Sequence, residues 1–97
     1  MTIARHYIIC AAEGKTDELE SALRNLADAV RAVVGCHGVD VMRDLDDERR
    51  YVFIEKWESV EVYKASMEKL PKDVVAPMMA ALDGPPQAAY LDVLVTS

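Results

Sequence analysis

Residues 50–57 read RYVFIEKW, which is the alternation of a β-strand with apolar side chains on both faces. Successive residues of a strand point to opposite faces of the sheet. One face of this strand holds three aromatic residues and an acid: Tyr51, Phe53, Glu55 and Trp57. The other face holds Val52, Ile54 and Lys56. A sheet built on this strand therefore needs a cover on each side, and one layer of helices can cover only one of them.

Hydrophobic periodicity predicts three further strands and the helices between them. Strands are expected at residues 3–12, 36–43 and 88–95, and the charged residues 44–49 are typical of a hairpin loop. Apolar residues recurring at steps of three and four predict a helix over residues 16–34.

A second helix is expected from Val60 to Leu70, where apolar residues again follow helical spacing. Thr16 and Ser59 are the expected N-caps of the two helices, and Gly35 is expected to end the first. Pro71 and Pro77 leave room for only a short additional helix before the last strand.

The resulting order is β-α-β-β-α-β, which predicts an α+β, ferredoxin-like domain spanning residues 1–97. Its four strands would form one antiparallel sheet with helices on a single face. The apolar residues of the uncovered face favour a second copy of the sheet packed against it. We therefore expect a homodimer with an isologous contact.

The composition excludes several classes of protein. A net charge of −6 over 97 residues disfavours a nucleic-acid-binding role, which normally requires a basic surface. No apolar run is long enough to span a membrane, and the N-terminus lacks a signal-peptide pattern. We expect a cytoplasmic protein with no membrane partner. Two cysteines, Cys10 and Cys36, and two histidines without clustered acids predict neither a disulfide framework nor a metal site.

Two stretches of sequence resemble a known family. Residues 53–57, FIEKW, are followed by ESVE, and residues 34–39 read VGCHGV. In this order and spacing the chain resembles the antibiotic biosynthesis monooxygenase domain family of dimeric α+β barrels. That family includes cofactor-free oxygenases of polycyclic phenols, quinol oxygenases, heme-degrading enzymes and members without known activity.

The resemblance favours some branches of the family over others. Heme-degrading members carry a His nine residues after the Trp, where this chain has Ser66, and an Asn in the first strand, where residues 3–12 have none. Heme binding or degradation is therefore the weaker alternative. The aromatic-polyketide branch has a Tyr six residues after the Trp, and Trp57 and Tyr63 match that spacing.

These features predict a mostly apolar pocket between sheet and helices, lined by Phe53, Trp57, Tyr63 and Met67. Trp57 would form a wall against which a flat substrate stacks. Each of these residues could equally be ordinary core. Glu55 on the same face would orient a neighbour and needs a polar partner, for which Arg5, Arg43 and Arg50 are the candidates.

The leading hypothesis is a cofactor-independent monooxygenase acting on a small or polycyclic phenol or quinol with molecular oxygen. His37 or His6 would be the general base, because histidine titrates near neutral pH, and Tyr63 would hydrogen-bond a substrate hydroxyl. Neither a cofactor nor a metal is expected. The competing hypothesis is a non-catalytic dimeric module that binds a small ligand or has a regulatory role.

Overall fold

The computed structural model describes residues 2–96 and contains one four-stranded antiparallel sheet. The strands run in the spatial order β2-β3-β1-β4. In chain order they are β1 (Ile3–Cys10), β2 (Cys36–Arg43), β3 (Arg50–Trp57) and β4 (Gln87–Asp92). This arrangement confirms the predicted ferredoxin-like fold.

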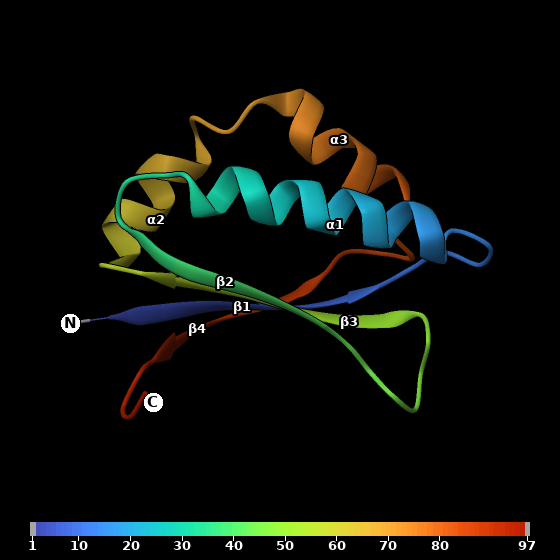
Figure 1. Ribbon diagram of the computed structural model, residues 1–97, viewed down its shortest axis with the longest axis horizontal. Helices are drawn as coiled ribbons and strands as arrows, with labels where there is room; N and C mark the ends of the chain where they lie inside the picture. The colour runs from blue at the N-terminus through green and yellow to red at the C-terminus, as the bar shows by residue number, and fades with distance from the viewer. Residues whose placement is uncertain (1, 97) are drawn as a thin grey trace.

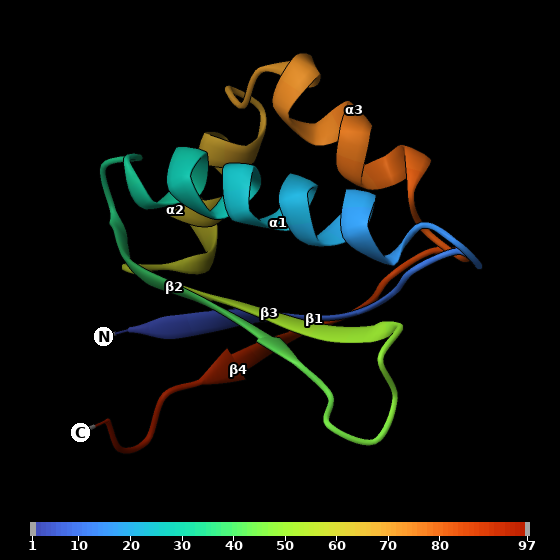
Figure 2. The same cartoon turned by 45° about the vertical axis from the view of Figure 1, so that its right-hand side comes forward.

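Three helices cover one face of the sheet: α1 (Thr16–Arg31), α2 (Val60–Met67) and α3 (Lys72–Ala80). Figure 1 shows all three on the same side, with α1 running along the sheet. Figure 2 shows that no other element of residues 2–96 covers the opposite side. The short helix that was predicted before the last strand is present as α3. None of the three helices is long and apolar enough to cross a membrane.

Strand register decides which side chains face the helices. Tyr7 of β1 pairs with Phe53 of β3, and Arg5 pairs with Glu55, so all four share the helix-covered face. On β3, Tyr51, Phe53, Glu55 and Trp57 are buried, whereas the alternate residues are partly exposed. The alternation predicted for residues 50–57 is confirmed.

The ends of helix α1 differ from the prediction. Thr16 is the first helical residue, and Lys15 holds the N-cap position without a side-chain hydrogen bond. The helix ends at Arg31, four residues before Gly35, because Gly35 (φ 96°) lies in the turn that leads to β2. A Cβ at this position would lie 2.5 Å from Cγ1 of Val62, so the turn requires glycine.

The Ser59 prediction is confirmed, since its side chain accepts a hydrogen bond from the backbone N–H of Val62. Strand β4 is shorter than predicted and ends at Asp92, opposite Ile3. Strand β1 begins at Ile3, so residues beyond Asp92 have no strand left to pair with. Leu94 and Val95 consequently extend past the sheet and are 86% and 91% exposed.

Candidate active site

A cavity of about 200 Å³ lies between the sheet and the helices. Its sheet side is formed by Tyr7, Ile9, Phe53 and Glu55. Its helix side is formed by α1, α2, α3 and the loops beside α3, through Leu26, Met67, Leu70, Val75, Met78, Met79 and Pro86. Glu55 and Tyr7 are therefore the only described residues with polar side chains in an otherwise apolar wall.

Glu55 is the central polar residue of this cavity. It is 2% exposed, and its Oε1 accepts a hydrogen bond of 2.8 Å from the indole Nε1–H of Trp57. Burial raises the pKa of Glu55 to about 7, although the bond from Trp57 and the charge of Arg5 act in the opposite direction. A carboxyl with this pKa can accept or donate a proton at neutral pH.

None of the three arginines expected as partners of Glu55 forms an ion pair with it, although Arg5 is its neighbour on β1. Arg43 pairs with Glu20 and Arg50 with Asp44, whereas Arg5 donates to tyrosines. The hydrogen-bond partner of Glu55 is the indole of Trp57, which stands two residues later on the same face. This spacing was visible in the sequence and could have indicated the contact.

Trp57 is fully buried and does not line the cavity. It packs edge-on against Tyr63, with the ring centroids 5.8 Å apart. The predicted role of Trp57 as a stacking wall is thus not reflected in the cavity lining. The indole reaches the cavity only through its hydrogen bond to Glu55.

Tyr63 belongs to a group that we call the Arg5 cluster: Arg5, Tyr7, Tyr63 and Tyr90. The Arg5 Nε–H donates to the hydroxyls of Tyr7 (3.3 Å) and Tyr63 (3.2 Å), and these two hydroxyls hydrogen-bond to each other. Desolvation raises the pKa of Tyr7, so its phenol stays protonated. Tyr7 joins this cluster to the cavity.

The two histidines lie away from the cavity. His6 pairs with Ile54 and Ala89 and alternates with Arg5 and Tyr7, so its side chain lies on the uncovered face of the sheet. His37 is exposed at a bulge in β2, between Cys36 and Gly38. Of the seven predicted site residues, the structure brings three to the cavity: Phe53, Glu55 and Met67.

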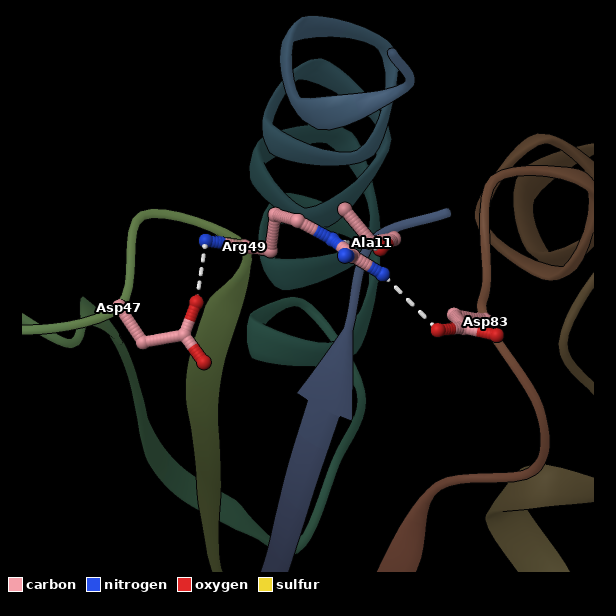
Figure 3. Close-up of polar contacts among 4 residues, drawn as sticks. All are labelled: Ala11, Asp47, Arg49 and Asp83. Atoms are coloured by element: carbon pink, nitrogen blue, oxygen red, sulfur yellow. Dashed lines mark hydrogen bonds and ion pairs between the residues drawn. The ribbon is translucent and has the colours of Figure 1, made fainter. Parts of the chain in front are cut away.

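Outside the cavity wall, four residues form a polar group that we call the Arg49 clasp: Ala11, Asp47, Arg49 and Asp83 (Figure 3). The Arg49 Nε–H donates to the carbonyl of Ala11 (2.9 Å), and a terminal nitrogen donates to Asp83 (2.8 Å). The backbone N–H of Arg49 donates to Asp47 (3.1 Å). These bonds tie the segment after α3 to the ends of β1 and β3.

No group of three or more His, Cys, Asp and Glu side chains placed to hold a metal ion occurs within residues 2–96.

Comparison with known proteins gives a family and a fold. The sequence model described as "Antibiotic biosynthesis monooxygenase" matches residues 3–69 of the chain. No curated protein matches the sequence.

Several solved structures share the fold. Rv0793 from Mycobacterium tuberculosis is 18% identical, with a TM-score of 0.85 covering 100% of this chain and 99% of the other. PA3566 from Pseudomonas aeruginosa is 24% identical, with a TM-score of 0.84 covering 97% and 95%. SnoaB from Streptomyces nogalater, a cofactor-independent oxygenase, is 15% identical, with a TM-score of 0.84 covering 98% and 95%.

Proposed function

The chain belongs to the antibiotic biosynthesis monooxygenase family, and from this premise we propose that it is a cofactor-independent monooxygenase of a small phenol or quinol. The observation that carries the proposal is Glu55, a buried carboxyl with a pKa of about 7 in the wall of an apolar cavity. The similar fold of SnoaB, a cofactor-independent oxygenase, supports the reaction class.

The size of the cavity favours the small end of the predicted substrate range. It measures about 200 Å³. A dry protein cavity of about 150 Å³ accommodates benzene. We therefore assign the site to one substituted aromatic ring rather than to a three- or four-ring polyketide.

Glu55 would begin the reaction as a general base. Its carboxylate takes the proton of a phenolic hydroxyl, and the resulting electron-rich anion passes one electron to molecular oxygen. Recombination of the two radicals forms a C–O bond at the neighbouring ring carbon, and the protonated Glu55 gives its proton to the resulting peroxide. The Glu55 carboxylate then takes the ring proton from that carbon while the O–O bond breaks, and it passes this proton to the departing hydroxide, which leaves as water. The ring carbon keeps one oxygen as a carbonyl, which gives the quinone. For hydroquinone, the overall reaction consumes one oxygen molecule and yields hydroxybenzoquinone and water.

Three of the predicted roles change in this proposal. The base becomes Glu55 instead of His37 or His6, because Glu55 lines the cavity and both histidines lie outside it. Trp57 becomes a positioning residue, since its Nε1–H fixes one oxygen of the carboxyl. Tyr63 does not line the cavity, and its hydroxyl contacts that of Tyr7, which does, so no bond from Tyr63 to the reacting hydroxyl is assigned.

The uncovered face of the sheet supports the homodimer as part of this proposal. Met42 and Leu91 on this face are 48% and 45% exposed, and Leu94 and Val95 extend beyond it. Exposed apolar surface of this kind marks a contact site.

We expect a dimer in sedimentation at micromolar concentration and a monomer for Ile54→Lys. Val34→Lys is the matched control, because Val34 is 92% exposed and outside the sheet. A monomeric wild-type protein contradicts this part of the proposal.

Oxygen consumption tests the enzymatic claim. With hydroquinone and ¹⁸O₂, the wild type should form hydroxybenzoquinone that carries one labelled atom, whereas spontaneous oxidation forms benzoquinone and hydrogen peroxide. Glu55→Gln sets the background, because the amide keeps the shape of the side chain and cannot act as a base. If no phenol, hydroquinone or anthrone in a substrate panel is consumed faster than by Glu55→Gln, the protein is not this enzyme.

A non-catalytic binding module is the second candidate. It is favoured by the position of both histidines outside the cavity. Within residues 2–96, Glu55 is then the only carboxyl or imidazole group in the cavity wall, without a second catalytic partner. Quenching of Trp57 fluorescence by aromatic ligands, without any oxygen consumption, would select this alternative.

A further inference from the structure

Arg5 differs from every other arginine in the described chain. Each of the other five has a carboxylate oxygen within 4 Å, in the pairs Arg24–Glu20, Arg31–Asp28, Arg43–Glu20, Arg49–Asp83 and Arg50–Asp44. Arg5 has none within residues 2–96, although the chain carries six more acids than bases. No contacting carboxylate of these residues therefore neutralises the charge of Arg5.

Aromatic rings take the place of an acid around Arg5. The guanidinium carbon lies 3.9 Å from the ring centroid of Tyr90, 5.1 Å from that of Tyr7 and 5.2 Å from that of Tyr63. Cation–π contacts stabilise the cation without neutralising it. The cluster therefore keeps a net positive charge at the margin of the cavity.

The cluster also holds more hydrogen-bond donors than acceptors. A guanidinium has five N–H donors, and only the Nε–H of Arg5 has acceptors among the described residues, namely the hydroxyls of Tyr7 and Tyr63. Those two hydroxyls bond to each other, which uses one of their two protons. The terminal nitrogens of Arg5 and one phenolic proton thus remain available to an incoming acceptor.

The cluster that holds these unpaired donors adjoins the cavity through Tyr7. Tyr7 lines the cavity and accepts from Arg5, and Arg5 is the cross-strand neighbour of Glu55. Tyr90 covers one face of the guanidinium, and the terminal nitrogens at its edge have no acceptor among the described residues. A carboxylate suits such an edge, because its two oxygens match the paired N–H groups of arginine.

We propose that Arg5, with the hydroxyls of Tyr7 and Tyr63, binds an anionic substituent of the substrate while the aromatic ring occupies the cavity. The substrate class is then a hydroxylated aromatic carboxylic acid. This inference rests on the proposed function only in placing the ring in the same cavity. Arg5 determines specificity and does not take part in the proton transfer.

Paired ligands test the inference by calorimetry. The probes are 2,5-dihydroxybenzoate, its uncharged methyl ester and hydroquinone. The wild type should bind the acid at least about tenfold more tightly than the ester, the ratio expected for a charge-assisted hydrogen bond. Arg5→Gln should abolish this preference. Arg43→Gln, which removes the same charge from an arginine paired with Glu20, should retain it.

Two results overturn the inference: equal binding of acid and ester by the wild type, or a preference that survives in Arg5→Gln. If Arg5→Gln does not fold, a crystal structure of the wild type with 2,5-dihydroxybenzoate decides. The carboxylate should lie within hydrogen-bond distance of Arg5, and a carboxylate bound elsewhere contradicts the proposal.

The outcome is separable from that of the proposed function. Labelled hydroxybenzoquinone from hydroquinone together with equal binding of acid and ester would retain the oxygenase and refute the anion site. An Arg5-dependent preference without oxygen consumption would retain the anion site and refute the oxygenase.

Discussion

Arg49 and Arg5 both connect the sheet to neighbouring elements, but the N–H groups of the two side chains donate to different kinds of acceptor. Arg49 donates to a backbone carbonyl and to the carboxylate of Asp83, both fixed acceptors (Figure 3). Arg5 donates only to the hydroxyls of Tyr7 and Tyr63 and meets no acid within residues 2–96. A guanidinium that is paired with a carboxylate of the same protein stabilises the fold. A guanidinium without such a partner can still bind an anionic ligand.

The acids at the two places show the same contrast. Asp83 is exposed at its side chain and paired with Arg49. Glu55 is buried, and its partner is the neutral indole of Trp57. A buried carboxyl without a cation destabilises the fold when it ionises. Ionised Glu55 therefore lowers the stability of the fold, whereas the Arg49 clasp raises it.

The largest expected effect is on catalysis. Glu55→Gln should lower kcat/KM for hydroquinone by about 100-fold or more, the usual contribution of a general base. The same carboxyl-to-amide change at Asp83 should leave kcat/KM unchanged, because Asp83 does not line the cavity. Rates of oxygen consumption measure both. Equal losses in the two variants would remove the distinction between the acids.

The next effect concerns stability as a function of pH. The folded-state pKa of Glu55 is about 7, above its ordinary value of 4.5. Between these values the folded protein retains a proton that the unfolded chain has released, so stability falls as the pH rises through this window. Below pH 4.5 the effect disappears.

Glu55→Gln removes this pH dependence. At about pH 8 the variant should gain up to about 3 kcal/mol over the wild type, from about 1.36 kcal/mol per pKa unit. At about pH 4 the two proteins should be equally stable with respect to Glu55. Urea denaturation at both pH values measures the difference, and a variant that is no more stable than wild type at the higher pH contradicts the raised pKa.

A smaller effect is expected at the clasp. Arg49→Gln should lower the free energy of unfolding by about 1–2 kcal/mol, because the carbonyl of the buried Ala11 loses its donor. Ligand preference should not change, since Arg49 lies outside the cavity wall. Urea denaturation and calorimetry with 2,5-dihydroxybenzoate check both statements. A lost preference for the acid would mean that both arginines serve the ligand.

Asp83→Asn should have the smallest effect, about 0.5 kcal/mol or less, as is usual for an exposed ion pair. The bond from Arg49 to Ala11 survives in this variant. A loss in urea denaturation as large as that of Arg49→Gln would show that the ion pair, rather than the bond to Ala11, holds the clasp.

The fold was predictable because it follows from local patterns. The alternation at residues 50–57 placed Glu55 and Trp57 on the buried face, and Ser59 marked the start of α2. The ends of β4 and α1 were not, since they depend on where β1 begins and on how the turn at Gly35 packs against Val62.

The site was predictable only in part, for a similar reason. Phe53, Glu55 and Met67 were found because they follow the buried pattern. Tyr7 was missed, and Arg5 was named only as a candidate partner of Glu55, because their place in the site depends on the pairing of β1 with β3, which no single strand reveals. His6 was chosen for its titration, but alternation with Tyr7 already indicated the opposite face.

The most direct test of the central claim is the titration of Glu55 itself. Carbon-13 NMR of the glutamate carboxyl groups, with Glu55→Gln assigning the signal, follows the protonation of this one residue. The midpoint should lie at about pH 7. A midpoint near the ordinary value of 4.5 would contradict the proposal, because Glu55 would then behave as a solvated acid rather than as a buried base.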